Sequence, residues 1–225
     1  GFPGLMGLLP APGARKAAIL ALTPVCARGA EIGADHGITS AHLLQSGRCG
    51  TMIVSDISAA SLDKARRPFA LHGLEGRAVF RVADGLRALD GPVGAVVIAG
   101  MGAQRIAQIL SGCTPALAGA AFILQPIPDP PFLRRWLMEN GFRLEAERLA
   151  REGRRYYIVL RAARGRAAYT PKELLLGPLL LRERPPLWRE YLCWRRNCLL
   201  AGREAGDAVG WIKEELDALD GTDGV

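Results

Sequence analysis

The hydrophobic and polar positions between residues 15 and 162 follow two patterns in turn. Short apolar runs rich in β-branched residues alternate with stretches in which apolar positions recur every three or four residues. This alternation is typical of a parallel β-sheet whose strands are joined by crossover helices. The predicted strands are residues 30–34, 51–56, 78–83, 94–100, 120–125, 142–150 and 154–162. The predicted helices are residues 38–47, 58–72, 102–111 and 130–140.

The ends of these elements carry further signals. Ser58 is predicted to cap the second helix, and Pro68 is predicted to kink or end it. The last two strands are joined by the short turn REGRR, which allows an antiparallel hairpin but not a crossover helix. Five crossover-linked strands followed by a hairpin is the order found in class I, Rossmann-like methyltransferases. The pattern therefore predicts this α/β fold, by analogy of element order.

The chain changes character after Arg166. Several Gly and Pro residues follow, and then two apolar stripes with steps of three and four residues begin at Leu187 and at Ala205. A break with glycines separates the stripes, so we expect an antiparallel helical hairpin. We therefore divide the chain into a methyltransferase-like domain, residues 1–166, and a small helical extension, residues 167–225.

The composition indicates an ordinary globular protein. Of the 225 residues, 49% are hydrophobic and 23% are charged, which excludes disorder and collagen-like repeats. Every apolar run is interrupted before the roughly 20 residues that span a bilayer, so no membrane-spanning segment is expected. The apolar start of the chain precedes its first charges, which is the reverse of the order in a secretory signal.

The cysteines and histidines do not form a metal or disulfide pattern. The five cysteines are scattered and include no CxxC pair, which argues against a disulfide framework and a zinc knuckle. The histidines, His36, His42 and His72, lack the spacing of metal ligands, so no metal site is expected. We expect buried, reduced thiols in a cytoplasmic protein.

The positive charge of the chain is local. The formal net charge is +7, and residues 133–166 alone hold ten Arg and four Glu. The basic residues of the whole chain are 25 Arg and four Lys. Arg makes forked hydrogen bonds to phosphate and stacks on bases, which suits a nucleic acid. Because an Arg-rich chain also follows from a GC-rich genome, RNA binding and a merely solvated basic face are equal alternatives on composition.

The first predicted strand runs into the loop EIGADHG. Gly33 and Gly37 allow a tight turn close to a ligand, and Glu31 and Asp35 put carboxylates at the edge where open α/β sheets bind ligands. A dinucleotide fold has GxGxxG here so that a pyrophosphate rests on a helix N-terminus, whereas this loop is acidic. A sulfonium cofactor has no phosphate and tolerates the carboxylates; an ordinary tight turn is the alternative. His36 is expected to orient the loop.

The next two strands also end in acidic residues. Asp56 closes the second strand, where a carboxylate accepts hydrogen bonds from ribose hydroxyls, although it also suits the start of a helix. Asp84 and Gly85 follow the third strand, where they either accept from the exocyclic amine of an adenine or form a simple turn. Because acidic groups end three strands in succession, we expect them to meet at one rim of the sheet.

The fourth and fifth strands end in residues suited to a ligand as well. Ala99, Gly100 and Met101 belong to the run AGMGAQ, whose glycines present a flat backbone surface to a planar base or a methyl donor. A strand-to-helix turn with Met101 in the core is the alternative. Gln125 and Pro126 place a polar group at the same edge and are predicted to contact the substrate.

Together these motifs resemble those of one family, the bacterial tRNA (adenine-22-N1)-methyltransferases, TrmK. The chain is similar to the family in the DHG loop of EIGADHG, in the strand ending SDIS and in the DGL of residues 84–86. It is also similar in IAGMG, in LQP followed by LRRWL, and further on in ERLAREGRRYYIVL and GPLLL. The resemblance runs from about Arg15 to the C-terminal helices, and DHG followed by IAGMG is its specific part.

The resemblance implies a class I methyltransferase domain with a helical extension, S-adenosylmethionine as cofactor and tRNA as substrate. The residues it implies for the cofactor lie at the strand ends and are Glu31, Gly33, Gly37, Asp56, Ile57, Asp84, Gly85, Ala99, Gly100 and Met101. Three positions depart from the family: Ile38 stands for Tyr, Ile127 for Asn and Ala103 for the second Gly of GMGG. Ile38 and Ile127 remove polar groups near the expected base pocket.

The implied reaction leaves positive charge on the adenine. A carboxylate can stabilise this charge or take the N6 proton, and the candidate is Asp35, with His36 as helper. Because N1 lies on the pairing edge, the base has to leave its stack first. We expect a monomer whose Arg-rich segment and helical hairpin grip the tRNA backbone. The basic residues expected there are Arg134, Arg135, Arg154 and Arg155.

Other functions are also compatible with the sequence. A non-catalytic RNA-binding descendant keeps the basic surface without turnover, and Ile38 and Ile127 favour it. A methyltransferase acting on a small molecule or a protein keeps the cofactor loop but has no need of the Arg cluster. An NAD oxidoreductase has the least support because GxGxxG is absent.

Overall fold

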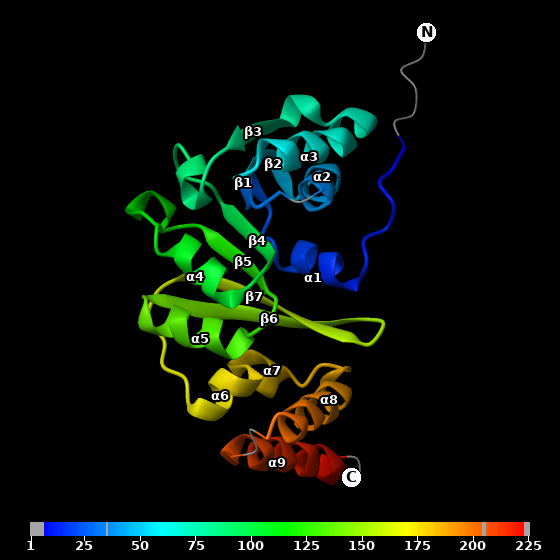
Figure 1. Ribbon diagram of the computed structural model, residues 1–225, viewed down its shortest axis with the longest axis vertical. Helices are drawn as coiled ribbons and strands as arrows, with labels where there is room; N and C mark the ends of the chain where they lie inside the picture. Colours follow the sequence, from blue (N-terminus) through cyan, green and yellow to red (C-terminus); the bar gives the residue numbers. More distant parts are fainter. Residues whose placement is uncertain (1–6, 35, 204–205, 223–225) are drawn as a thin grey trace.

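The computed structural model describes residues 7–34, 36–203 and 206–222. Its centre is a seven-stranded sheet in the order β3-β2-β1-β4-β5-β7-β6 (Figure 1). The strands are β1 (Cys26–Ile32), β2 (Cys49–Asp56), β3 (Ala78–Val82), β4 (Ala95–Met101), β5 (Ala121–Pro126), β6 (Phe142–Glu152) and β7 (Arg155–Arg164). Strands β1 to β5 are parallel, and β7 is antiparallel to both β5 and β6. The predicted class I methyltransferase order is therefore confirmed.

Helices cover both faces of the sheet (Figure 1). One face carries α1 (Ala14–Leu22), α2 (Ile38–Gln45) and α3 (Ala59–His72), and the other carries α4 (Ala103–Leu110) and α5 (Pro130–Glu139). Short 3-10 helices occupy Glu75–Arg77, Gly85–Ala88 and Pro115–Leu117. The two sets of helices close two separate hydrophobic clusters on the sheet. The result is the three-layer arrangement that right-handed crossovers produce.

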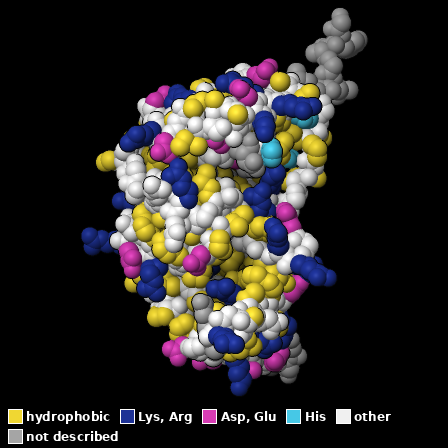
Figure 2. Space-filling model, in the orientation of Figure 1, with side chains coloured by type: hydrophobic (Ala, Val, Ile, Leu, Met, Phe, Trp, Pro, Cys, Tyr) yellow, Lys and Arg dark blue, Asp and Glu magenta, His cyan; other side chains and the backbone are white. Residues whose placement is uncertain are grey.

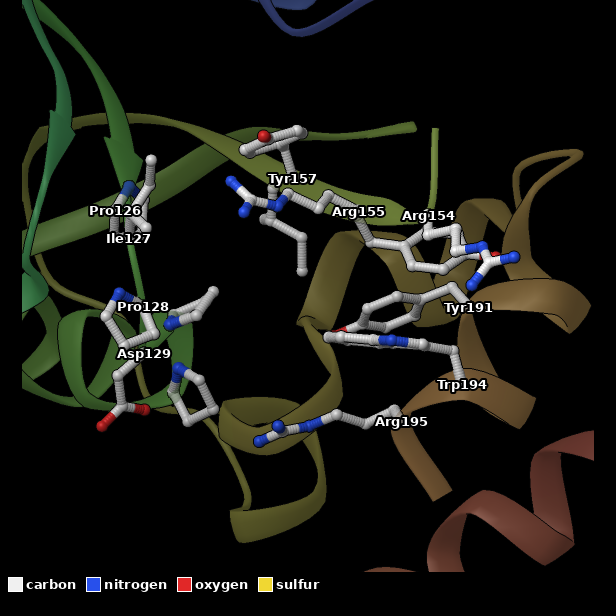
Figure 3. Close-up of a pocket in the computed structure, with 14 residues that line it drawn as sticks. Pro126, Ile127, Pro128, Asp129, Arg154, Arg155, Tyr157, Tyr191, Trp194 and Arg195 are labelled. Carbon is white, nitrogen blue, oxygen red and sulfur yellow. The ribbon is translucent and has the colours of Figure 1, made fainter. Parts of the chain in front are cut away.

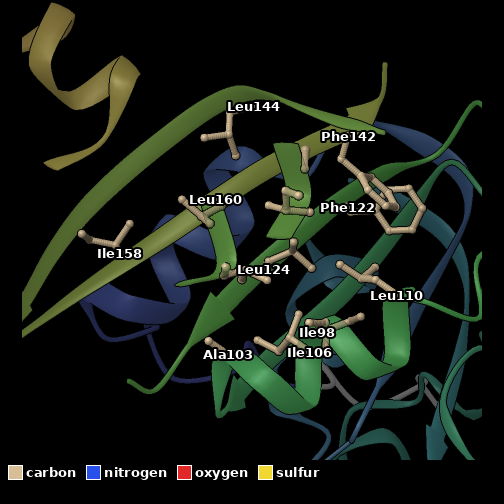
Figure 4. Close-up of a cluster of buried hydrophobic side chains, with 14 of the residues drawn as sticks. Ile98, Ala103, Ile106, Leu110, Phe122, Leu124, Phe142, Leu144, Ile158 and Leu160 are labelled. Carbon is tan, nitrogen blue, oxygen red and sulfur yellow. The ribbon is translucent and has the colours of Figure 1, made fainter. Parts of the chain in front are cut away.

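Alternate residues of the central strands face these two clusters. In β4, Val96 and Ile98 pack on the α4 side, whereas Val97 packs toward the opposite face. In β5, Phe122 and Leu124 join the cluster on the α4 side (Figure 4). Because both faces are covered, these strands are apolar at consecutive positions. That is why each of them stands out in the sequence as a continuous hydrophobic run.

Helix α3 starts where the sequence predicts but continues past Pro68. The Ser58 side chain accepts a hydrogen bond from the N–H of Ser61 at 3.2 Å, so the predicted cap is confirmed. The helix runs through Pro68 to His72, and the predicted end at this proline is wrong. Pro68 lies on the buried face of the helix, next to Phe69. Burial of the ring offsets the backbone hydrogen bond that proline cannot donate.

The chain after the hairpin forms α6 (Pro171–Leu176), α7 (Pro178–Glu183), α8 (Trp188–Ala201) and α9 (Gly206–Thr222). Arg189, near the start of α8, pairs with Asp220, near the end of α9, at 2.7 Å. The two helices are therefore antiparallel, as predicted. The sequence pattern does not predict α6 or α7, although a capping box at Thr170 begins α6. Within the described ranges, no helix is both long and apolar enough to cross a membrane.

The helical extension shares its hydrophobic core with the sheet. Leu176, Trp188 and Leu192 belong to the same cluster as Leu144 and Ile158 of the hairpin. The cluster therefore joins elements from both sides of residue 166. The division into domains at this residue stays a prediction.

The cysteines are free thiols that differ in their surroundings. Cys49 is buried, Cys198 is exposed, and the other three are half-buried. The expectation of buried thiols is therefore wrong for Cys198. The sulfur of Cys49 lies 3.6 Å from that of Cys26 on the neighbouring strand. Burial, together with the adjacent Cys26 thiol, raises the pKa of Cys49 to about 12.

We expect iodoacetamide to alkylate Cys198 quickly and Cys49 very slowly in the folded protein at pH 8. The thiolate is the reactive form, so the raised pKa of Cys49 leaves little thiolate at pH 8, and burial keeps the reagent away from its sulfur. Peptide mass spectrometry after timed labelling measures both rates. In urea the two rates should converge. Equal rates in the folded protein would contradict the burial of Cys49.

Candidate cofactor and substrate site

A cavity of about 470 Å³ opens at the carboxyl ends of β1, β2 and β4, and we name it the rim cavity. Open α/β sheets bind their ligands at this edge. The residues that line it come from these strand ends, from α1 to α3 and from the ends of β5 and β7. They are Arg15, Lys16, Glu31, Gly33, Ala34, His36, Ile38, Thr39, Asp56, Ser61, Ala99, Gly100, Met101, Ile127 and Tyr157.

Two strand ends approach each other closely in the rim cavity. Gly33 follows β1 with a left-handed backbone, φ +82°, and a Cβ atom there would lie 2.1 Å from Cε of Met101. Glycine combines this φ with this close approach at low cost. Met101 packs against the core, as the alternative interpretation expects, and also lines the cavity. Its contact with the cofactor stays a prediction.

Hydroxyl and backbone donors hold the two carboxylates that the described residues bring to the rim cavity. The hydroxyl of Ser40 donates to Oε1 of Glu31 at 2.6 Å, and Glu31 is buried. The N–H of Ser58 donates to Oδ1 of Asp56 at 2.9 Å. Asp56 is half-buried at the end of β2. Its carboxylate is thus fixed in direction while it lines the cavity.

Helix α1 brings positive charge to the same cavity through Arg15 and Lys16. The Nη1 group of Arg15 donates to Oε1 of Gln125 at 2.9 Å. The Arg15 guanidinium also lies 5.9 Å from the centre of the Tyr157 ring. The cavity therefore presents carboxylates and cations together, which suits a ligand that carries both an amino and a carboxylate group.

Seven of the residues predicted for cofactor binding or catalysis line the rim cavity: Glu31, Gly33, His36, Asp56, Ala99, Gly100 and Met101. Asp35 lies outside the described residues. Gly37, Ile57, Asp84 and Gly85 are described but do not line this cavity. Their roles in cofactor binding stay predictions. Sequence reasoning missed Thr39 and Ser61, which carry no motif signal of their own, and the two cations of α1. It also gave no site role to Tyr157, although this residue belongs to the motif ERLAREGRRYYIVL.

Asp84 follows β3 at the same edge of the sheet but pairs with another side chain. The Nη2 group of Arg105 in α4 donates to Oδ1 of Asp84 at 2.9 Å. Strand β3 is an edge strand, separated from β1 by β2. All three carboxylates therefore end strands at the expected rim of the sheet, but only Glu31 and Asp56 among them line the rim cavity. Contact of Asp84 with the cofactor stays a prediction.

Close packing explains why residue 37 is a glycine. It precedes α2 with φ +72°, and a Cβ atom there would lie 2.4 Å from the carbonyl oxygen of Ala65 in α3. A side chain at this position would therefore collide with backbone. The glycine lets the N-terminus of α2 pack directly on α3.

We expect Gly37→Ala to lower the free energy of unfolding by about 2–5 kcal/mol. The left-handed φ costs about 1–2 kcal/mol for any L-residue, and the collision with a backbone oxygen adds about 1–3 kcal/mol of overpacking. Gly47→Ala is the matched control, because Gly47 has φ +75° and no atom of the described residues lies within 4 Å of a Cβ atom there. Gly47→Ala should lower the free energy of unfolding only by the cost of the left-handed φ, about 1–2 kcal/mol. Urea unfolding measures both variants, and equal losses would contradict close packing at Gly37.

Gln125 is fully buried, which corrects its predicted contact with the substrate. Its Oε1 accepts hydrogen bonds from Arg15 and from the N–H of Gly100, at 2.9 and 3.2 Å. Its Nε2 donates to the carbonyl of Pro126 at 3.1 Å. Gln125 thus fixes the positions of Arg15 and Gly100, which both line the rim cavity.

Arg134 is also fully buried, and its predicted contact with tRNA is wrong. Its Nε donates to Oε1 of Glu147 at 2.7 Å. Its Nη1 donates to the carbonyls of Leu174 and Leu175 at 3.1 and 3.2 Å. With no part of its side chain in solvent, this residue is structural. The partners lie on other elements, so the sequence alone does not reveal the pairing.

A second cavity, of about 780 Å³, lies beside the rim cavity, and we name it the hairpin cavity (Figure 3). It is lined by residues 126–131, by residues 154–158 next to the β6–β7 turn, and by Tyr191, Trp194 and Arg195 of α8. Ile127 and Tyr157 line both cavities. The two cavities are therefore neighbours that share one wall.

The remaining residues predicted for the substrate lie at or near this surface. Pro126, Arg154 and Arg155 line the hairpin cavity. Arg135 is exposed on α5 and does not line it. Figure 2 shows Lys and Arg side chains spread over the face in view, with hydrophobic side chains exposed between them. The structure leaves the tRNA contacts of these four residues as predictions.

Known proteins resemble this chain in both sequence and fold. The model of the family TrmK, tRNA (adenine(22)-N(1))-methyltransferase, matches residues 29–199. This chain belongs to the TrmK family. The matched range contains the strand ends of the rim cavity and the α8 residues of the hairpin cavity. Membership in TrmK confirms the family expected from the motifs, and it excludes the NAD oxidoreductase.

Individual relatives agree with the TrmK assignment. A tRNA (adenine(22)-N(1))-methyltransferase of Bacillus subtilis (strain 168) is 32% identical over 163 residues, which are 69% of this chain and 68% of the relative. A Streptococcus pneumoniae protein in complex with S-adenosyl-L-methionine is 26% identical, with a TM-score of 0.84 over 92% of this chain and 100% of that one. The TrmK of M. capricolum, bound to S-adenosyl-homocysteine, is 19% identical and has the same fold, with a TM-score of 0.78 over 92% and 98% of the two chains.

Proposed function

We propose that this TrmK chain transfers the methyl group of S-adenosylmethionine to N1 of an adenine in tRNA, with the cofactor in the rim cavity. One observation carries the proposal: strand-end carboxylates, glycine backbone and cations line a single cavity at the ligand edge of the sheet in a TrmK protein. S-Adenosylmethionine is the cofactor of the family, and the S. pneumoniae relative binds it.

The residues of the rim cavity fit this cofactor. Asp56 ends β2, the position from which α/β folds hold the hydroxyls of a ribose. Glu31 suits the amino group of the methionine tail, and Arg15 and Lys16 suit its carboxylate. The volume of about 470 Å³ lies within the range of small-molecule sites. When bound, the cofactor supplies a methyl group that its sulfonium charge has already activated.

The target adenine is proposed to lie at the wall that the two cavities share. Ile127 and Tyr157 form this wall, and 46% of Ile127 is exposed. An apolar side chain and an aromatic ring can hold an adenine by packing and stacking, without a donor that would occupy its N1 lone pair. Ile38, which also lines the rim cavity, has the same character. The base has to leave its stack to arrive there, because N1 lies on its pairing edge.

The main contribution of the protein to the chemical step is to orient the adenine and the cofactor relative to each other. Adenine N1 is a neutral nucleophile, so holding it in line with the methyl group and the sulfur supplies much of the rate. The methylated base carries positive charge, which a carboxylate stabilises or relieves by accepting the N6 proton. We assign this role to Asp35, whose position lies outside the described residues. His36, which lines the rim cavity, is the proposed helper.

The exposed Arg residues near the hairpin cavity are proposed to hold the tRNA backbone. Arg135, Arg154 and Arg155 all reach solvent, and neutralised phosphates give affinity without sequence preference. We further propose that the protein acts as a cytoplasmic monomer without a metal ion. Methyl transfer from a sulfonium needs no Lewis acid, because the leaving sulfur is already positively charged.

Mapping of the methylated nucleotide tests this function. The purified protein is incubated with S-adenosylmethionine and an unmodified tRNA transcript, and the digested RNA is analysed by mass spectrometry. We expect one N1-methyladenine at position 22, and none in a matched transcript with guanine at that position. Methylation at N6, or at other positions alone, contradicts the proposal. Binding of tRNA without methylation would instead support a non-catalytic RNA-binding protein, the alternative that Ile38 and Ile127 favour.

A further inference from the structure

The hairpin cavity has an aromatic wall opposite a proline-rich wall. Residues 126–131 form one side, and Tyr191 and Trp194 of α8 stand on the other (Figure 3). The ring centre of Trp194 lies 5.8 Å from that of Tyr191 and 5.2 Å from that of Tyr156. Trp194 is 37% exposed, whereas Tyr191 is buried. Trp194 is therefore the solvent-exposed member of an aromatic cluster, in which Tyr156 and Tyr191 pack against it.

Positive charge surrounds this aromatic wall. Arg154, Arg155 and Arg195 line the cavity, and Asp129 is the one acidic side chain among its described lining residues. Asp129 accepts a hydrogen bond from the N–H of Phe132 at the start of α5, and its carboxylate points away from the aromatic wall (Figure 3). The Nε of Arg195 is buried and has no hydrogen-bond partner among the described residues. A buried donor without a partner beside a cavity marks a place for an acceptor.

We propose that the hairpin cavity binds an unstacked nucleotide of the tRNA next to the target adenine, with its base on Trp194 and its phosphate on Arg155 and Arg195. This inference rests on the proposed function. Aromatic faces with cations beside them are the means by which proteins hold single-stranded nucleic acid, because every base has a π-face and every nucleotide a phosphate. The forked donors of Arg match phosphate oxygens.

The positions of the side chains separate this nucleotide from the target. The target adenine has to reach the rim cavity, which it does at Ile127 and Tyr157, whereas Trp194 lines only the hairpin cavity. The volume of about 780 Å³ leaves room for a second nucleotide beside the target base. The guanidinium of Arg155 extends from the aromatic side toward Ile127 (Figure 3). It therefore lies where a phosphate linking the two nucleotides would pass.

The test compares variants of Trp194 in tRNA binding. Trp194→Ala should raise the Kd for tRNA about 5- to 150-fold, the effect of losing one base stacked on an aromatic ring. The substitution should raise this Kd, whereas kcat at saturating tRNA should stay at the wild-type value. Trp194→Phe, which keeps an aromatic face, should recover most of the affinity. Leu200→Ala is the matched control, because Leu200 is exposed on the same helix and lines neither cavity.

A tRNA variant makes the test specific. Abasic sites are placed in turn at the two nucleotides that flank the target adenine. One of them should weaken binding to the wild-type protein by the same factor, and should not weaken binding to Trp194→Ala any further. Unchanged tRNA affinity in Trp194→Ala overturns the proposal. So does a fall in kcat alone, which would put the target adenine itself on Trp194.

Two further measurements distinguish a failure of this inference from misfolding of a variant and from a failure of the proposed function. The Kd of each variant for S-adenosylmethionine, measured by calorimetry without RNA, should equal that of the wild type and shows that the variant is folded. Methylation of tRNA by the wild-type protein is assayed in parallel. If the wild type methylates adenine N1 while Trp194 and the flanking base prove unimportant, the proposed function stands and this inference fails.

Discussion

Replacing Asp56 with alanine is expected to weaken S-adenosylmethionine binding by about 10- to 150-fold. The carboxylate ends β2 in the rim cavity, with its direction fixed by the N–H of Ser58 at 2.9 Å. A hydrogen bond to a charged acceptor contributes about 1.5–3 kcal/mol, and the ribose hydroxyls lose this acceptor in the variant. Isothermal titration calorimetry with S-adenosylmethionine measures the change without any RNA.

Two further variants control the Asp56 experiment. Asp56→Asn keeps an acceptor for the N–H of Ser58 but removes the charge, so its affinity should lie between those of the wild type and Asp56→Ala. Asp63→Ala removes an exposed carboxylate of α3 that pairs with Arg66 at 3.8 Å, and it should bind the cofactor as the wild type does. Wild-type affinity in a folded Asp56→Ala protein would refute the placement of the ribose at this carboxylate.

The sheet could be predicted because a similar run of hydrophobic residues recurs in successive strands along the chain. Strands β4 and β5 are covered on both faces, so the run Val96, Val97 and Ile98 is hydrophobic without interruption. The residues after each strand could be predicted as ligand groups by the same reasoning, since parallel strands end at one edge. Glu31 and Asp56 meet in the rim cavity for this reason.

Helix α1 was harder to predict because its start carries no polar cap. Gly13 occupies the N-cap position without a side-chain hydrogen bond, and the helix is only nine residues long. A weak signal was present, since Ala18, Ile19 and Leu22 recur at the spacing of one buried helix face. Missing this helix meant missing the two cations that it brings to the rim cavity.

Gln125 and Arg134 show where sequence reasoning reaches its limit. Side chains of these types are mostly exposed, so at the end of a strand and on a helix they suggest contact with a substrate. Each is buried because a distant residue satisfies it: Arg15 lies 110 positions from Gln125, and Glu147 lies 13 positions from Arg134. Such pairs depend on tertiary packing, which no local pattern encodes.

The buried pair of Arg134 and Glu147 joins the sheet to the helical extension. Oε2 of Glu147 accepts hydrogen bonds from the N–H groups of Leu179 and Leu180 at the start of α7, at 2.9 and 3.2 Å. Arg134 donates to two carbonyls of α6, as described above. The ends of a helix leave backbone groups without partners inside the helix. This ion pair supplies partners for two short helices at once.

Arg134→Met is therefore expected to lower the free energy of unfolding by about 3–5 kcal/mol, because Glu147 is left as a buried charge without its partner. For a chain of this length the melting temperature should fall by about 6–20 °C. Arg135→Met is the matched control, since Arg135 is the exposed neighbour on the same helix and should change stability by no more than about 0.5 kcal/mol. Adding Glu147→Gln to Arg134→Met should restore part of the loss, because the neutral amide still accepts from the N–H of Leu179 and leaves no buried charge. A double variant less stable than Arg134→Met in urea would refute the unpaired charge as the cause.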